Sequence, residues 1–212
     1  MVSLNNKVVC ITGASSGIGA ACAAAFAGMG AKLLLFARRS SRLQETADSL
    51  ASKYNAAIHC VTLDVRNRND VESAFAQLPE EWKKISLLVN NAGLARGMAP
   101  LQTGVVEDWE EMIDTNVKGL LYVTRTVLPG MIARNEGHVI NIGSTAGQTV
   151  YPNGNVYCAT KFAVQALTEG IKMDTVGTPI RVSVVAPGSS TPSSAPCAFT
   201  ATRTAPMRHT KG

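Results

Sequence analysis

Short apolar runs alternate with helix-like segments along most of the chain. The apolar runs are 7–11, 31–36, 57–63, 85–90, 137–142 and 180–185, and the helix-like segments are 17–29, 40–53, 68–77, 106–134 and 154–175. Strict alternation of apolar strands with helices predicts a parallel sheet that helices cover on both faces, with right-handed crossovers. We therefore expect an α/β fold with a doubly wound sheet in the strand order 3-2-1-4-5-6, and ligands beyond the carboxyl ends of the strands.

A glycine-rich turn follows the first apolar run. The stretch Thr12-Gly13-Ala14-Ser15-Ser16-Gly17-Ile18-Gly19 leads into an alanine-rich helix that ends at Gly30. Glycines let the backbone approach a ligand closely, and the unpaired N–H groups and dipole of a helix start attract phosphate. The spacing Gly-x-x-x-Gly-x-Gly differs from the commoner dinucleotide pattern. A tight turn without a ligand is the alternative, and a phosphate site is the prediction.

Tyr157 and Lys161 lie four residues apart in Tyr157-Cys158-Ala159-Thr160-Lys161, thirteen residues after Ser144. In a helix this spacing places both side chains on one face. An ammonium near a phenol lowers the phenol pKa, so that Tyr157 could act as a general acid or base near neutral pH. Ser144 could hydrogen-bond the oxygen that gains or loses the proton. A tyrosine and a lysine at this spacing are common in helices and indicate little by themselves. The predicted phosphate site at the glycine-rich turn is what favours a catalytic role for the pair.

Further motifs complete a resemblance to the short-chain dehydrogenase/reductase family over residues 7–188. They are Asp64-Val65 after the third strand, Asn90-Asn91-Ala92-Gly93 after the fourth and Pro187-Gly188 after the sixth. Asn116, Ser144, Tyr157 and Lys161 match the catalytic tetrad of the family in order and approximate spacing. The resemblance implies a Rossmann-like fold and reversible hydride transfer between a nicotinamide cofactor and an alcohol or ketone.

The resemblance also implies roles for individual residues. The expected cofactor contacts are Gly13, Ser15, Ser16, Gly17, Ile18, Gly19, Asp64, Val65, Asn90, Asn91, Ala92, Gly93, Tyr157, Lys161, Pro187 and Gly188. Asp64 is expected to contact the adenine. Tyr157 would take the alcohol proton, Lys161 would hydrogen-bond the nicotinamide ribose, and Asn116 would support a water relay.

The end of the second apolar run indicates which dinucleotide binds. Arg38 and Arg39 follow this run, and no Asp or Glu occurs between Ala37 and Glu45. An acidic residue here would bind the ribose 2′-hydroxyl, whereas the guanidinium fork of arginine suits a 2′-phosphate. We therefore predict NADP rather than NAD. The alternative is that both arginines are merely solvated on a surface turn.

A closer resemblance is to the NADP-dependent 3-hydroxy acid dehydrogenases, which include serine and allo-threonine dehydrogenases. The stretches 89–95, 108–110, 112–116 and 141–147 carry it. A small 3-hydroxy acid is therefore the expected substrate. A broad carbonyl reductase is the alternative.

Composition bounds the remaining function classes. Of the net charge of +5, three positive charges lie in the last ten residues, and no basic stripe with interleaved aromatic residues suggests nucleic-acid binding. No apolar run is long enough to span a membrane, and the scattered cysteines and histidines have no metal-ligand spacing. We expect a cytoplasmic protein without metal, which binds a small-molecule substrate and forms a homo-oligomer if the family pattern holds.

The last 24 residues differ from the rest. Residues 189–212 are rich in Ser, Thr and Pro, have no apolar periodicity and predict an irregular or disordered tail after a single catalytic domain at 1–188. Family members continue further, with a covering helix and a seventh strand that are not found here. A truncated cofactor-binding remnant with little activity is therefore a third possibility.

Overall fold

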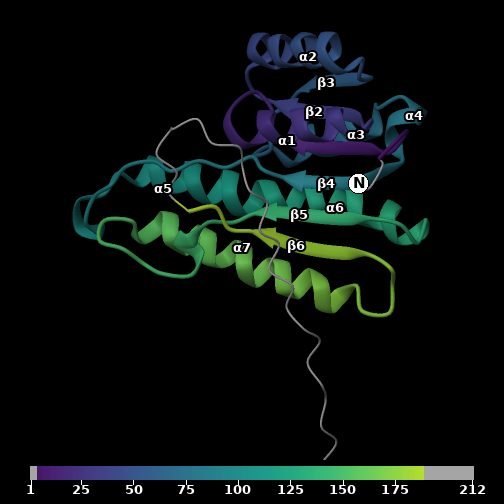
Figure 1. Ribbon diagram of the computed structural model, residues 1–212. Helices are drawn as coiled ribbons and strands as arrows, with labels where there is room; N and C mark the ends of the chain where they lie inside the picture. The colour runs from purple at the N-terminus through teal and green to yellow at the C-terminus, as the bar shows by residue number, and fades with distance from the viewer. Residues whose placement is uncertain (1–3, 189–212) are drawn as a thin grey trace, which may run out of the picture.

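The computed structural model describes residues 4–188, which contain one parallel sheet flanked by helices (Figure 1). The strands are β1 (Val8–Thr12), β2 (Lys32–Ala37), β3 (Ile58–Thr62), β4 (Ile85–Asn90), β5 (His138–Ile142) and β6 (Arg181–Val185). The sheet order is β3-β2-β1-β4-β5-β6, so the predicted order is confirmed for the described residues. The expectations of an irregular tail and a missing seventh strand concern 189–212, which lie outside these residues.

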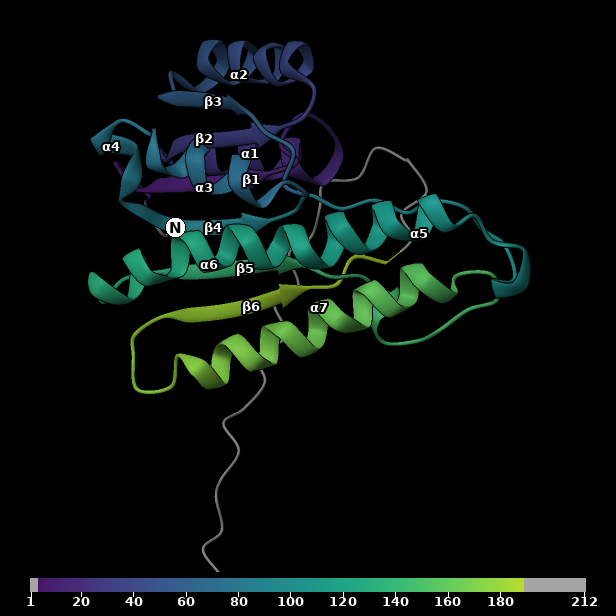
Figure 2. The ribbon, with the colours of Figure 1, turned by 180° about the vertical axis from the view of Figure 1, so that it is seen from behind.

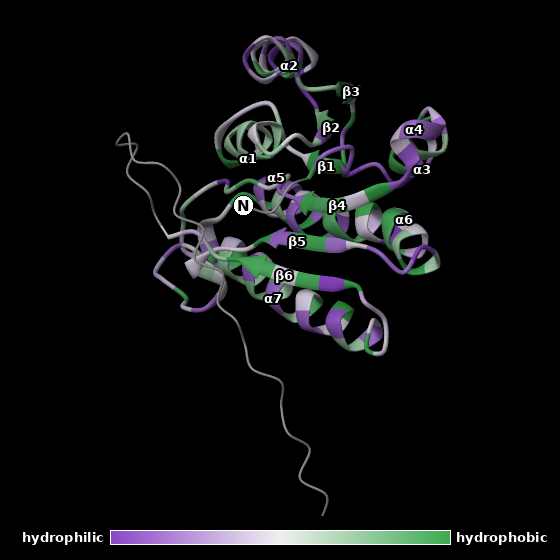
Figure 3. Cartoon of the chain, turned by 45° about the vertical axis from the view of Figure 1, so that its right-hand side comes forward, coloured by the Kyte–Doolittle hydropathy of each residue, from purple (hydrophilic) through white to green (hydrophobic). Residues whose placement is uncertain are grey.

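Helices cover both faces of the sheet. They are α1 (Gly17–Gly28), α2 (Ser40–Tyr54), α3 (Arg68–Ala76), α4 (Glu80–Lys83), α5 (Val106–Ile113), α6 (Leu120–Ala133) and α7 (Asn155–Asp174). Helices α1 and α2 lie on one face, and α3, α6 and α7 lie on the other, as the opposite views show (Figures 1 and 2). Figure 3 shows strands that are largely hydrophobic and a helix α7 in which hydrophilic and hydrophobic residues alternate. This arrangement is the doubly wound one that the alternating pattern predicts.

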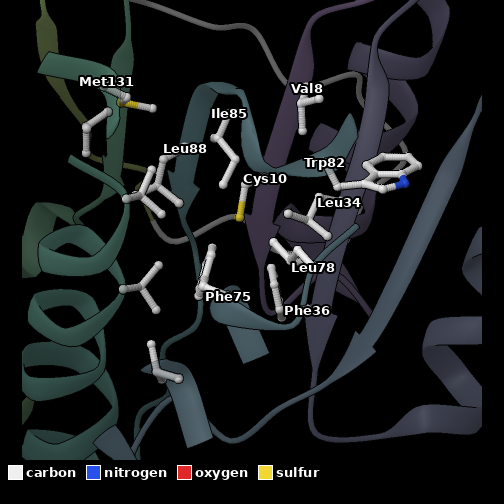
Figure 4. Close-up of a cluster of buried hydrophobic side chains, with 14 of the residues drawn as sticks. Val8, Cys10, Leu34, Phe36, Phe75, Leu78, Trp82, Ile85, Leu88 and Met131 are labelled. Carbon is white, nitrogen blue, oxygen red and sulfur yellow. The ribbon is translucent and has the colours of Figure 1, made fainter. Parts of the chain in front are cut away.

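Two apolar clusters, one on each face, form the core because successive strand residues point to opposite sides. Val9, Leu33 and Leu35 face the cluster that α1 and α2 cover. Cys10 and Leu34 face the other cluster, where α3, α4 and α6 contribute most of the helical side chains (Figure 4). All five of these side chains are fully buried. The central strands therefore read as continuous apolar runs, because both of their faces are covered.

Two details differ from the sequence expectation. The predicted helix at 106–134 is interrupted by a π-helical segment at Asp114–Gly119, whereas helix α6 continues through Pro129 without being split there. A proline inside a helix predicts a kink or split just before it, here near Leu128, but α6 is not split there and the interruption contains Asn116 instead. The short helix α4, which contributes the buried Trp82, was not predicted.

The turn between β1 and α1 is packed so tightly that it requires glycine. Gly13 and Gly17 have φ angles of +67° and +55°, which other residues rarely adopt. A Cβ at Gly19 would overlap the carbonyl oxygen of Gly13 and would lie 2.5 Å from Nδ2 of Asn91. The first turn of α1 is therefore held directly against the end of β1.

Replacing Gly19 by alanine tests this close approach. We expect Gly19→Ala to lower the free energy of unfolding by about 1–3 kcal/mol, the usual cost of overpacking. Gly28→Ala in the same helix is the control, because its Cβ would meet the Tyr54 ring at an ordinary 3.5 Å. Urea unfolding of both variants measures the difference, and equal stabilities would contradict the packing described here.

Candidate active site

A cleft of about 1220 Å³ lies at the carboxyl ends of the strands and joins the glycine-rich turn to the predicted tetrad. Of the residues predicted from the sequence, those that line it are Gly13, Ser15, Ser16, Gly17, Ile18, Arg38, Arg39, Asp64, Val65, Asn91, Ala92, Gly93, Ser144, Tyr157, Lys161, Pro187 and Gly188. Most of the predicted residues thus come together in one cavity. Gly19, Asn90 and Asn116 are not among its lining residues.

Helix α7 presents Tyr157 and Lys161 to this cleft. The Nζ atom of Lys161 lies 5.9 Å from the centre of the Tyr157 ring and donates a hydrogen bond of 2.9 Å to the carbonyl oxygen of Ile142. Burial lowers the pKa of Lys161 to about 8, because desolvation disfavours its charged form. The amine is still mostly protonated at pH 7, so a positive charge faces the phenol ring.

Ser144 reaches the same place from the end of β5. Its Oγ accepts a hydrogen bond of 3.1 Å from the backbone N–H of Ala146, at the start of the short 3₁₀ helix Thr145–Gly147. A hydroxyl that accepts in this way keeps its own proton to donate. A Cβ at Gly147 would lie 2.6 Å from the carbonyl oxygen of Lys161, so the 3₁₀ helix packs directly on α7. This contact holds the serine loop close to the Tyr157–Lys161 face.

Asn116 lies behind the cleft in the π-helical segment. Its Nδ2 donates to the carbonyl oxygen of Leu94 at 2.9 Å and to Oγ1 of Thr160 at 3.0 Å, and its Oδ1 accepts from the Leu94 N–H at 2.8 Å. These bonds link the loop after β4 to helix α7. A Cβ at Gly93 would lie 3.1 Å from Asn116 Oδ1 and 3.6 Å from Lys161 Nζ, so both polar groups pack beside this loop.

The two asparagines after β4 have separate structural tasks. Asn91 lines the cleft, and its Nδ2 donates to the carbonyl oxygens of Thr12 and Gly13 at 2.9 and 3.1 Å. Asn90 is buried under the sheet end, where its Nδ2 donates to Thr124 Oγ1 at 2.8 Å and to Asn141 Oδ1 at 2.9 Å. The sequence motif therefore contains one residue at the cleft and one that braces the strands beneath it.

Charged side chains gather at the far end of the cleft, beyond β2 and β3. Arg39 donates to Ser15 Oγ at 3.3 Å and to Ser16 Oγ at 3.0 Å, which places it against the glycine-rich turn. Asp64 is held by Arg66, with the closest N···O distance at 2.6 Å. Partial burial works to raise the pKa of Asp64, but hydrogen bonds and charge from Arg66 outweigh it and lower that pKa overall. Asp64 is therefore ionised at neutral pH.

Glu111 of helix α5 is a member of this charged group that the sequence did not indicate. It accepts hydrogen bonds from Arg38 at 3.2 Å and from Arg96 at 2.9 Å. The hydrogen bond from Arg96 is the main cause that lowers the pKa of Glu111. Glu111 and Arg96 carry no recognisable motif, and only Arg96, six residues after the end of β4, has a position that could have drawn attention to it.

Further residues complete the lining of the cleft. They are Phe36, Ala37, Leu63, Leu94, Ala95, Arg96, Thr115, Ile142, Gly143, Thr145, Ala146 and Tyr151. Tyr151 lies between Ser144 and Tyr157 in the chain, and a Cβ at Gly154 would overlap the Tyr151 ring. The ring therefore packs on the start of α7, at the end of the cleft that holds Tyr157. Its place between two predicted site residues was the available signal.

Residues 4–188 contain neither a metal site nor a membrane-spanning helix. No cluster of three or more His, Cys, Asp or Glu side chains there is arranged to hold a metal ion. In the same part of the chain, none of the helices combines the length and the apolar character that crossing a membrane requires.

Comparison with known proteins agrees with this geometry. The family model described as short chain dehydrogenase matches residues 7–196. The NADP-dependent 3-hydroxy acid dehydrogenase YdfG of Escherichia coli K12 is 50% identical over 181 residues, which cover 85% of this chain and 71% of that protein. Sulfoacetaldehyde reductase 2 of Chromohalobacter salexigens is 45% identical over 184 residues, which cover 86% of this chain and 72% of that protein.

A solved structure extends the likeness to three dimensions. The closed form of a serine dehydrogenase complexed with NADP+ superimposes with a TM-score of 0.81 at 49% sequence identity, over 85% of this chain and 71% of that one. The match in fold, the extent of the family model and the identity to curated relatives agree. The chain belongs to the short-chain dehydrogenase family of oxidoreductases.

Proposed function

We propose that the protein catalyses reversible hydride transfer between NADP(H) and the hydroxyl-bearing carbon of a small 3-hydroxy acid. One observation carries the proposal. A single cleft runs from a phosphate-type turn and two arginines to Ser144, Tyr157 and Lys161. Such a cleft suits an extended dinucleotide whose reactive ring ends beside a proton-transferring side chain.

The chemistry of the cleft fits this cofactor. The N-terminus of α1 begins at Gly17, and its N-cap residue Ser16 makes no side-chain capping bond, so the backbone N–H groups of the first turn remain available for phosphate. A Cβ at Gly17 would meet no atom within 4 Å, which leaves open room above the turn. Thr115 lines the cleft, and its buried Oγ1 has no hydrogen-bond partner among the described residues.

Arg38 and Arg39 support NADP over NAD. Both line the cleft just after β2, and hydrogen bonds to Ser15 and Ser16 hold Arg39 against the glycine-rich turn. No acidic residue follows the strand at the position that would bind a ribose 2′-hydroxyl. The relative from E. coli is named as NADP-dependent, which agrees with this preference.

Three side chains divide the proton chemistry. The bound nicotinamide supplies the hydride acceptor or donor. Tyr157 accepts the substrate hydroxyl proton during oxidation and returns it during reduction. The positive charge of Lys161, fixed by its bond to Ile142, favours negative charge on Tyr157, and Ser144 donates a hydrogen bond to the substrate oxygen. Asn116 positions these groups through its bonds to Leu94 and Thr160.

The names of the relatives support the substrate class. One is named for 3-hydroxy acids and the other for reduction of sulfoacetaldehyde, and both names denote small compounds with an acid group near the reacting carbon. Tyr151 and Leu94 line the cleft together with Ser144 and Tyr157. A small hydroxy acid would lie between these groups.

A substrate panel tests the reaction class. We expect NADP+-dependent oxidation of serine, allo-threonine or 3-hydroxyisobutyrate at higher kcat/KM than oxidation of neutral secondary alcohols. NADPH formation measured at 340 nm reports each rate. Preference for neutral alcohols would favour a broad carbonyl reductase, and NADPH binding without turnover of any compound would contradict the enzymatic proposal.

Removal of the Tyr157 hydroxyl tests the proton transfer. We expect Tyr157→Phe to lower kcat by at least about 10²-fold, the low end for general acid–base catalysis, with an unchanged far-UV spectrum. Tyr54→Phe, at the remote end of α2, should keep wild-type turnover. Undiminished turnover by Tyr157→Phe would remove Tyr157 from the mechanism.

Reversing the charge of Arg38 tests the cofactor preference. We expect Arg38→Asp to weaken NADPH binding by at least about tenfold, since a charged hydrogen bond contributes about 1.5–3 kcal/mol, and to shift preference toward NADH. Arg42→Asp makes the same charge change on the exposed surface of α2 and should leave the ratio of the two dissociation constants near that of the wild type. An unchanged ratio in Arg38→Asp would overturn the assignment.

A further inference from the structure

Glu111 joins the arginines of three separate loops at the far end of the cleft. Its Oε1 accepts from Nη1 of Arg38 at 3.2 Å and from Nη1 of Arg66 at 3.4 Å, and its Oε2 accepts from Nε of Arg96 at 2.9 Å. The arginines follow β2, β3 and β4 in turn. The Glu111 carboxylate thus accepts a hydrogen bond from Arg38. If the proposed function holds, Arg38 is also the residue that faces the 2′-phosphate of the cofactor.

The charge balance at this rim depends on Glu111. Three guanidinium groups (Arg38, Arg66 and Arg96) face two carboxylates (Asp64 and Glu111), which leaves one net positive charge among these five groups. Asp64 is already held by Arg66 at 2.6 Å and lies 4.0 Å from Arg38. Glu111 is therefore the carboxylate in direct contact with Arg38. Its removal would raise the net charge of these five groups from +1 to +2, beside the further positive charge of Arg39.

We propose that Glu111 is a specificity-determining residue, which competes with the 2′-phosphate for Arg38 and thereby limits the preference of the cleft for NADPH over NADH. The competition can be reversed during binding, because the Arg38 side chain is 45% exposed and exposed ion pairs are weak. A phosphate offers stronger, charge-assisted and bidentate hydrogen bonds. When the phosphate takes Arg38, Arg96 and Arg66 still neutralise Glu111.

Glu111 is free to act in this way because the packing of α5 does not rely on it. The adjacent Met112 is the buried residue of the helix, at 2% exposure, whereas the Glu111 side chain is 20% exposed and contacts the cleft-lining Arg38 and Arg96. Glu111→Gln keeps the size and shape of the side chain and removes only its charge. Glu110→Gln is a matched control, because Glu110 is exposed on the same helix and the ion pairs with Arg38, Arg66 and Arg96 are formed by Glu111.

Dissociation constants of NADPH and NADH for the full chain, measured by quenching of tryptophan fluorescence, test the inference. At low ionic strength we expect Glu111→Gln to bind NADPH about 3- to 10-fold more tightly than the wild type, with NADH affinity unchanged. The gain should shrink in about 0.5 M salt, because screening weakens interactions between exposed charges. Glu110→Gln should match the wild type for both cofactors.

Three results would overturn this inference: unchanged or weaker NADPH binding by Glu111→Gln, an equal gain for NADH, or an equal gain in Glu110→Gln. The Arg38→Asp variant separates this failure from failure of the proposed function. If Arg38→Asp loses NADPH affinity as expected while Glu111→Gln changes nothing, only the role of Glu111 fails. If Arg38→Asp also leaves NADPH affinity unchanged, the 2′-phosphate site itself is misplaced.

Discussion

The joint between the ends of β1 and β4 is the contact on which the cleft depends. Thr12 Oγ1 accepts hydrogen bonds of 3.0 Å from the N–H groups of both Asn91 and Ala92, and the Asn91 amide returns bonds to the Thr12 and Gly13 carbonyl oxygens. These strands are neighbours in space although two other strands separate them in the chain. The crevice of a doubly wound sheet opens where the strand order reverses, here between β1 and β4. The hydrogen bonds between Thr12 and Asn91 hold the two strand ends together at this point. The glycines of the turn lack side chains and can therefore pack closely against it.

Much of this arrangement follows from the sequence because its causes are local. Both faces of the central strands are covered, so each strand is an uninterrupted apolar run that is easily recognised. The parallel order follows from the alternation with helices, and the site then falls at the strand ends. The spacing of Tyr157 and Lys161 predicts a shared helix face, and the glycine-rich turn was needed to give that pair a function. The arginines directly after β2 were likewise predicted as site residues from their place in the chain, and both line the cleft.

The features of the site that the sequence does not predict depend on contacts between distant segments of the chain. Asn116 fits a catalytic motif in sequence, yet its side-chain bonds go to Leu94 and Thr160, which only the folded chain brings near it. Glu111 is one of several acids in α5, and nothing local distinguishes it from Glu110. Pro129 predicts a break in the long helix from its residue type alone, whereas the interruption lies where Asn116 bonds across to the loop after β4. These features depend on side-chain partners from distant segments of the chain, such as Leu94 and Thr160 for Asn116. Residue spacing within one segment therefore does not reveal them.

The buried amides under the cleft have a consequence for strand alignment. Asn90 and Asn141 are directly opposed in the pairing of β4 with β5, and Nδ2 of Asn141 continues the chain of bonds to Thr168 Oγ1 on α7 at 3.0 Å. Apolar side chains pair almost equally well after a slip, but an amide moved by one position would lose its partner in a dry interior, which costs several kcal/mol. These amides therefore fix the register of β4 against β5. They align the end of β5, which Ser144 follows, with helix α7, which carries Lys161, through polar atoms of residues that do not line the cleft.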